Sequence, residues 1–148
     1  RIELPEVPEI FTASVNIVPV SSGGSVLFIG TDGFGTMGGI SISVDNATMH
    51  FEKGSEAYGT IDIRDLIGCR HCYILRRNGN VWTVFVDGVK KIETQHTPSI
   101  SSSEHYIYLG GLASQYASGG RYAMTGYFSD FRYYSRALSD DEILLFSK

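Results

Sequence analysis

The last fifth of this chain carries its only helix-start signal, and this constrains the fold more than any other feature. Ser139 and Glu142 form a capping box, in which each side chain accepts a hydrogen bond from a backbone N–H at the start of the helix. Asp140 and Asp141 add negative charge where a helix dipole favours it. The segment before them, which begins at Gly126 and contains Tyr127, Phe131 and Tyr133, has the aromatic and polar composition of a strand. The sequence therefore predicts a long strand followed by one short helix starting near Ser139.

The rest of the chain has the pattern of short strands separated by glycine-containing turns. In the first of them, Phe11, Ala13, Val15 and Ile17 alternate with other side chains, as in a half-buried strand. Such segments recur about every 8–12 residues, which is typical of an all-β sandwich. Parallel α/β folds are excluded, because they require crossover helices that the pattern lacks. We expect an all-β fold with two antiparallel sheets.

Two central motifs carry a resemblance to a known family. His71 to Val89 has the form of a strand, an Asn78-Gly79 turn and a second strand that ends at Val86-Asp87-Gly88. Tyr106 to Gly111 is a strand followed by glycine. With the closing strand and helix, these motifs resemble the laminin-G-like jelly rolls of the concanavalin A-like lectin/glucanase superfamily. The resemblance implies a jelly-roll sandwich over residues 10–148, after a linker over residues 1–9. It does not single out a function, since this fold serves lectins, adhesins, enzymes and spacers.

Charge and hydropathy exclude two classes of partner. The net charge is −4 and the basic residues are scattered, whereas a phosphate-binding surface requires a clustered basic face, so we expect no nucleic-acid partner. The apolar runs are too short for membrane insertion. Because the chain starts at Arg1 without a leader pattern, we expect it to be part of a longer or processed protein.

Cys69 and Cys72 have the spacing of a redox or zinc motif. Zinc requires about four ligands, and no second cysteine pair exists to complete the site. Both cysteines fall in an expected strand, where residues three apart point to opposite faces. We therefore predict two unpaired thiols.

Catalytic carboxylates are not evident. Glycoside hydrolysis needs two positioned carboxyl groups, and the expected strands have no acidic residues at alternate positions. The family resemblance also implies a calcium ion at the sandwich rim, held by an aspartate of the closing strand. The matching position here is Ser129, and the carboxylate is displaced to Asp130, which we expect to point to the other face. Asp130 and Asp32 are the candidate Ca²⁺ ligands.

The aromatic residues give the best candidates for ligand binding. The segment 112–124 combines Ser, Gly, Tyr and Arg, a composition typical of recognition loops. We expect Tyr116 and Tyr122 to stack on sugar rings, and Gln115 and Arg121 to hydrogen-bond hydroxyl groups. The glycine-rich loop with Asp32 and Phe34 is expected to join this site. The alternative is that residues 112–124 only link two strands.

We interpret the chain as a non-catalytic carbohydrate-binding, lectin-like module of a larger surface, secreted or virion protein. Its expected partners are a glycan or polysaccharide and other protein domains of the same assembly. A structural or protein-contact module, such as a phage tail or capsid decoration domain, is the alternative. A polysaccharide-cleaving enzyme is the third interpretation.

Overall fold

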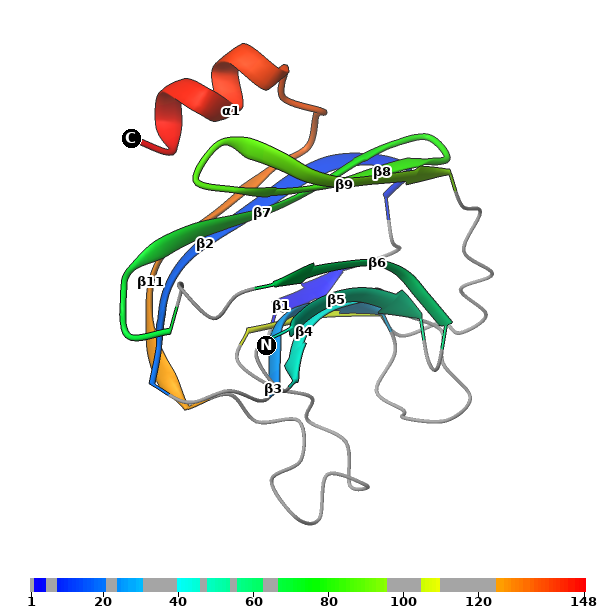
Figure 1. Cartoon of the computed structure of the whole chain (residues 1–148). Helices are drawn as coiled ribbons and strands as arrows, with labels where there is room; N and C mark the ends of the chain where they lie inside the picture. Colours follow the sequence, from blue (N-terminus) through cyan, green and yellow to red (C-terminus); the bar gives the residue numbers. More distant parts are fainter. Residues whose placement is uncertain are drawn as a thin grey trace.

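The structure, a computed structural model, describes residues 2–4, 8–20, 24–30, 40–45, 48–53, 56–62, 67–95, 105–109 and 125–148. Within these residues the chain forms two antiparallel sheets and one helix (Figure 1). The six-stranded sheet has the order β1 (Ile2–Leu4), β10 (His105–Leu109), β3 (Gly24–Gly30), β4 (Ile40–Asp45), β5 (Thr48–Lys53), β6 (Glu56–Asp62). The five-stranded sheet has the order β11 (Gly126–Tyr134), β2 (Ile10–Pro19), β7 (His71–Asn78), β8 (Val81–Val86), β9 (Val89–Gln95).

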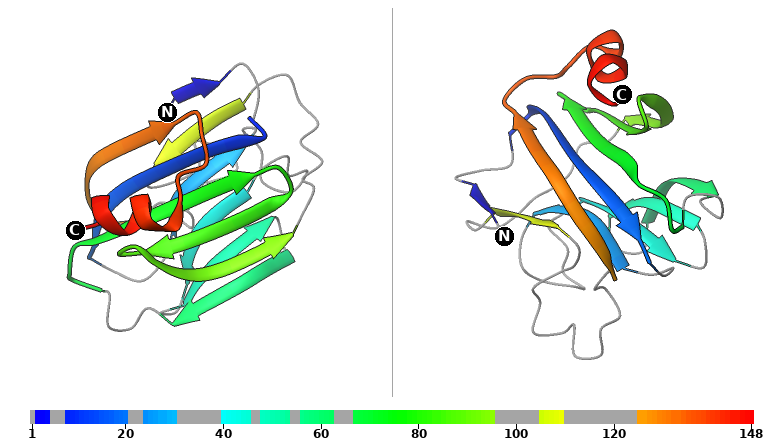
Figure 2. Two further views of the ribbon diagram at one scale, coloured as in Figure 1. Left: turned by 90° about the horizontal axis from the view of Figure 1, so that it is seen from above. Right: turned by 90° about the vertical axis from the view of Figure 1, so that its left-hand side faces the viewer.

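The two sheets face each other, and the helix α1 (Asp140–Phe146) lies on the outer side of the five-stranded sheet (Figures 1 and 2). Strands β6 and β9, at one edge of each sheet, are in contact. Strand β11 is at the other edge of the five-stranded sheet, beside β2 (Figure 2, right). The predicted sandwich of two antiparallel sheets with one short C-terminal helix is confirmed.

The expected linker over residues 1–9 needs a correction at its start. Ile2–Leu4 form strand β1, which pairs with β10 and becomes the edge of the six-stranded sheet. The prolines that suggested an extended linker, Pro5 and Pro8, follow this strand. A strand of three residues is too short to show the alternation of apolar and polar residues by which strands are predicted from sequence.

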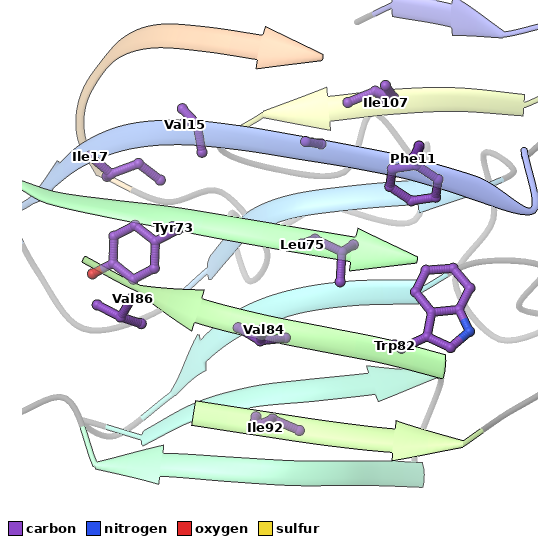
Figure 3. Packing of buried hydrophobic residues seen from close by; sticks show 11 residues of the cluster. Phe11, Val15, Ile17, Tyr73, Leu75, Trp82, Val84, Val86, Ile92 and Ile107 are labelled. Carbon is purple, nitrogen blue, oxygen red and sulfur yellow. The ribbon is translucent and has the colours of Figure 1, made fainter. Parts of the chain in front are cut away.

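Most of the core residues whose burial the structure describes lie on one face of the five-stranded sheet (Figure 3). Alternation places every second side chain of each strand on this inner face. The core residues of this sheet are Phe11, Ala13, Val15 and Ile17 of β2, Tyr73 and Leu75 of β7, Trp82, Val84 and Val86 of β8, and Ile92 of β9. Ile107 of β10, in the six-stranded sheet, packs with them. Burial among them raises the pKa of Tyr73 to about 12.

Three aromatic rings and one guanidinium connect four strands of the five-stranded sheet in this core. The rings of Trp82 and Phe11 meet edge to face with centroids 5.9 Å apart. Phe11 is also stacked on Tyr133 of β11 at 5.8 Å. The Arg77 guanidinium lies 4.9 Å from the Trp82 ring centroid, and its Nη1 donates to the carbonyl of Pro8 at 2.9 Å. Trp82 is fully buried, as expected for a packing role.

The two tight turns of the central hairpins have the glycines that were expected. Asp87 and Gly88 adopt φ of 51° and 77°, as a two-residue hairpin turn of type I′ requires. The first turn lies one residue later than the sequence suggested. Asn78 is the last residue of β7 and pairs with Val81, so Gly79, with φ of 61°, begins the turn.

The helix covers part of the outer face of the five-stranded sheet. Leu138 and Ile143 pack on Cys72, Ile74 and Phe85 and form a second apolar cluster with them. This cluster fixes the position of α1 through apolar burial.

Polar contacts fix the segment that leads into α1. The Thr12 hydroxyl donates to the carbonyl of Arg136 at 2.9 Å and accepts from the N–H of Leu138 at 3.0 Å. Arg76 donates to the carbonyl of Leu138 at 2.8 Å and to Asp140 Oδ1 at 2.7 Å. Thr12 has no exposed surface, so on folding these two hydrogen bonds replace the ones that its hydroxyl makes with water.

The capping box at the start of α1 is confirmed. The Glu142 N–H donates to Ser139 Oγ at 3.2 Å, and the Ser139 N–H donates to Glu142 Oε2 at 2.9 Å. Arg136 binds both oxygens of Glu142, at 2.9 and 2.7 Å. These hydrogen bonds, first that of Arg136 and then that of Ser139, lower the pKa of Glu142 to about 2.

Replacing Ser139 by alanine is expected to lower the free energy of unfolding by about 0.5–2 kcal/mol, because one helix N–H loses its acceptor. Urea denaturation followed by circular dichroism measures the change. Ser139→Asp is the matched control, because aspartate keeps a cap acceptor and should retain most of the stability. Equal losses in the two variants would contradict a capping role.

Cys69 and Cys72 are free thiols, as predicted. Their predicted placement on opposite faces of one strand is wrong for Cys69, which lies before β7 in an exposed bend. Cys72 lies in β7, and burial raises the pKa of its thiol. A thiol with a raised pKa is a poor nucleophile, so the geometry favours a packing role for Cys72.

Candidate functional site

Six of the predicted ligand-binding residues lie outside the described residues. They are Asp32, Phe34, Gln115, Tyr116, Arg121 and Tyr122. Asp130, a candidate metal ligand, is described, and it lies in the edge strand β11. The site can therefore be built upward from Asp130 and the side chains around it.

Asp130 occupies a β-bulge. Asn16 of β2 pairs with Ser129, but Ser14, two residues earlier in β2, pairs with Arg132, three residues later in β11. Asp130 has φ of 53°, an uncommon value for a residue other than glycine. The extra residue allows both Phe128 and Phe131, three positions apart, to pack against the core.

Because of the bulge, the Asp130 side chain points in a different direction from the one predicted from the sequence. Simple alternation would send it to the opposite face from its neighbour Ser129. Instead its carboxylate lies 3.4 Å from Nδ2 of Asn16, the pairing partner of Ser129. Asn16 lies between two inward-facing residues of β2, so Asp130 reaches the outer face of the five-stranded sheet.

Arg132 holds this carboxylate at two points. Its Nε donates to Asp130 Oδ1 at 2.9 Å, and its Nη2 donates to Asp130 Oδ2 at 2.7 Å. The Asp130 hydrogen bond, and then a hydrogen bond with Tyr134, raise the pKa of Arg132. The side chains of Arg132 and Asp130 are 41% and 46% exposed, so the pair is fixed and still accessible. Sequence analysis missed Asn16, because the bulge brings this residue of another strand to Asp130. It also missed Arg132, although the spacing of two residues in one strand already places Asp130 and Arg132 on the same face.

A large exposed aromatic ring lies next to this ion pair. Tyr127 of β11 is 74% exposed and pairs with Val18 of β2. Because the adjacent Phe128 packs against the core, alternation places Tyr127 on the outer face. We call Asn16, Val18, Tyr127, Asp130 and Arg132 the outer-edge patch. It combines an apolar ring, hydrogen-bond donors and an acceptor carboxylate on one surface.

A second polar cluster holds the turn between β8 and β9. Asp87 Oδ2 lies 2.6 Å from His71 Nδ1, and Asp87 Oδ1 accepts from the Cys72 N–H at 2.8 Å. The Asp87 N–H in turn donates to the Cys72 carbonyl at 2.9 Å. His71 Nε2 is buried, and no hydrogen-bond partner is found for it. These contacts connect the turn to the start of β7. The role of Asp87 is therefore structural.

The described part of the chain has neither a cluster of metal-ligating side chains nor a membrane-spanning helix. There, no group of three or more His, Cys, Asp or Glu side chains has the arrangement of a metal site. A calcium ion at Asp130 would have to compete with the Arg132 guanidinium for the same oxygens. Among the described residues, no helix has the length and apolar character needed to cross a membrane.

The fold is shared with several proteins of known structure at low sequence identity. Domain 4 of AbnA, an extracellular arabinanase of Geobacillus stearothermophilus solved with arabinotriose, superposes with a TM-score of 0.68 at 16% identity, over 99% of this chain and 71% of that one. A CBM40 of the Ruminococcus gnavus IT-sialidase, bound to α2,3-sialyllactose, gives 0.69 at 18% identity, over 96% and 84%. A heptameric SAP-like pentraxin of Limulus polyphemus gives 0.72 at 15% identity, over 99% and 73%.

Sequence comparison agrees with the structural one. No curated protein sequence matches the chain, but a family model described as concanavalin A-like lectin/glucanases superfamily matches residues 7–144. The matched range contains both hairpins of the five-stranded sheet, the bulged edge strand and most of α1. The chain belongs to the concanavalin A-like lectin/glucanases superfamily.

Proposed function

We propose that this chain is a non-catalytic carbohydrate-binding module of a larger surface, secreted or virion protein. The observation that carries the proposal is its sandwich, which superposes over nearly the whole chain on two modules solved with oligosaccharides. Those ligands are arabinotriose and α2,3-sialyllactose, and one of the parent proteins is an extracellular enzyme. A glycan or polysaccharide is therefore the proposed partner.

The loop residues Tyr116 and Tyr122 remain the proposed stacking groups, with Gln115 and Arg121 as hydrogen-bonding groups. A glycan array, run with and without calcium, identifies the ligand and tests the proposed Ca²⁺ at Asp32 and Asp130. Tyr116→Ala and Tyr122→Ala should then weaken binding about tenfold or more, because burying an aromatic face is worth roughly 1.5–3 kcal/mol.

The matched control variants keep the aromatic ring at each position. Tyr116→Phe and Tyr122→Phe retain the stacking surface and should bind within about threefold of the parent, a difference near 0.7 kcal/mol. Thermal melts of all four variants check that the fold is intact. If both alanine variants bind an identified glycan as tightly as the parent, these loops do not hold it.

We also propose that binding is not followed by cleavage. Both retaining and inverting hydrolysis ordinarily need two positioned carboxyl groups. Asp87 and Asp130 each have both oxygens hydrogen-bonded to protein donors. Reducing-sugar release that vanishes in Asp130→Asn would instead favour the third interpretation, a polysaccharide-cleaving enzyme.

A structural or protein-contact module is the second candidate. The specific observation in its favour is the exposure of large apolar side chains around α1, where Leu144 is 45% and Leu145 is 70% exposed. Val89 is also exposed. It follows Gly88, where an added Cβ would lie 3.0 Å from Leu144 Cα. A glycan array without any binder, together with capture of another domain of the same assembly, would favour this candidate.

A further inference from the structure

We propose that the outer-edge patch binds a neutral saccharide, with Tyr127 stacking on the sugar ring and Asp130 accepting hydrogen bonds from its hydroxyl groups. The inference rests on the carbohydrate-binding function proposed above. It adds a second ligand site to the loop residues proposed above, on the outer face of the five-stranded sheet around Asp130, and it names the class of sugar.

The polar half of the patch is held in a fixed arrangement before any ligand arrives. A carboxylate has about four lone-pair positions. Arg132 occupies one on each oxygen of Asp130, and Asn16 approaches Oδ2, which leaves one position on Oδ1. The bidentate guanidinium favours one orientation of the carboxylate, which lowers the side-chain freedom that is lost on binding.

Asn16 supplies the complementary groups. Its amide carries a carbonyl acceptor and a second N–H beside the one directed at Asp130. A sugar hydroxyl donates and accepts at once, so it needs an acceptor and a donor close together. The Asp130 carboxylate and the Asn16 amide, 3.4 Å apart, provide this pair.

The aromatic half lies at a suitable spacing. Tyr127 pairs with Val18, and the next cross-strand pair on the same face is Ser129 with Asn16. Two residues along a strand span about 7 Å, comparable with the breadth of one monosaccharide. Tyr127 is 74% exposed, and its ring can cover the apolar face of a sugar while its hydroxyl stays in water.

The charge of the patch indicates which sugars fit. Arg132 and Asp130 compensate each other, and their two hydrogen bonds of 2.9 and 2.7 Å direct the guanidinium at the carboxylate. An anionic sugar would have to displace Asp130 from Arg132 and would meet the Asp130 charge at short range. A neutral sugar needs neither change. The patch therefore favours neutral saccharides over sialylated or uronic ones.

The bulge is the device that builds this surface. Without the extra residue, alternation could not keep Phe128 and Phe131 both inside. The left-handed conformation of Asp130 is unfavourable for a residue with a side chain, and it is retained in an edge strand with a partly exposed carboxylate. Such bulges re-aim side chains at functional surfaces.

Isothermal titration with a panel of neutral oligosaccharides, including arabinotriose, and with α2,3-sialyllactose tests the inference. Tyr127→Ala should weaken binding of the neutral ligand about tenfold or more, while Tyr127→Phe keeps the ring and should bind within about threefold. Asp130→Asn should weaken the same ligand, because an amide loses the pairing with Arg132 and half of its acceptor positions. Leu145→Ala, an exposed change on α1, is the surface control and should bind like the parent.

A measurement on the unmodified protein gives a second readout. In ¹⁵N-correlated spectra, the neutral ligand should shift the amide signals of residues 14–18 and 126–132 by more than those of β9. This readout does not depend on whether Asp130→Asn folds normally.

The outcomes separate the two proposals. If a neutral glycan binds and Tyr127→Ala binds it as well as the parent, the outer-edge patch is not the site, although the carbohydrate-binding function stands. Binding of sialyllactose alone would likewise exclude the patch and leave that function standing. If neither neutral nor sialylated glycans bind at millimolar concentration, both the patch and the proposed function are wrong.

Discussion

Trp82→Ala is expected to lower the free energy of unfolding by about 3–5 kcal/mol, the usual cost of removing a fully buried large aromatic side chain. The loss includes more than the vacated volume. Phe11 loses its edge-to-face partner, and the buried Arg77 guanidinium loses the ring that it covers. Urea unfolding followed by circular dichroism measures the change, because Trp82 is the only tryptophan and the variant has no tryptophan fluorescence.

Two controls separate burial from aromatic character. Trp82→Phe keeps an apolar ring beside Phe11 and should cost less than the alanine variant. Tyr127→Ala removes an aromatic ring that is largely exposed, and it should change the stability by no more than about 0.5 kcal/mol. A loss below about 1 kcal/mol in Trp82→Ala would contradict the described core.

Gly88→Ala is expected to lower the free energy of unfolding by roughly 2–5 kcal/mol, from two causes. Gly88 has φ of 77°, where an added side chain costs about 1–2 kcal/mol. The new Cβ would also lie 3.0 Å from Leu144 Cα and 3.3 Å from Ser147 Cβ. Backbone atoms of α1 cannot yield as a flexible side chain does, so the overlap adds about 1–3 kcal/mol.

Gly79→Ala is the matched control for this prediction. Gly79 also lies in a tight hairpin turn with a positive φ, 61°, but an added Cβ there would have no atom within 4 Å. It should therefore show the backbone cost alone, about 1–2 kcal/mol. Equal losses in the two variants, measured by thermal or urea unfolding, would mean that α1 does not press on the turn between β8 and β9.

Local physical rules explain which parts of the fold could be predicted. The capping box at Ser139 and the turn at Asp87-Gly88 depend on neighbouring residues, and both appear as expected. The first turn was placed one residue early, because Asn78-Gly79 and Gly79-Asn80 both supply turn residues. Only the pairing of Asn78 with Val81 decides between them. Strand β1 was missed because its stability comes from pairing with β10, about a hundred residues away.

The candidate site was harder to predict because it depends on register between distant strands. Asp130 was identified from sequence, but its direction was wrong. Alternation holds only while two strands advance together, and the bulge shifts β11 by one residue against β2. Asn16 looked like an ordinary strand residue until that shift brought it to the Asp130 carboxylate. The neighbouring Arg132 could have been found from its spacing of two residues along the same strand. The loop residues 115–122 stay a prediction, since they lie outside the described residues.

The hydroxyl of Thr12 has a consequence for how the chain folds as it is synthesised. It binds the backbone of Arg136 and Leu138, and Thr12 and Arg136 are 124 residues apart. Strand β2 lies between β7 and β11, so one side of it stays unpaired until β11 has been translated. Contacts at such separation carry a large loop-closure cost and slow folding. Until then Phe11 lacks its stacking contact with the ring of Tyr133. The incomplete sheet also has an unpaired edge strand, which can bind a chaperone or pair with another chain and aggregate.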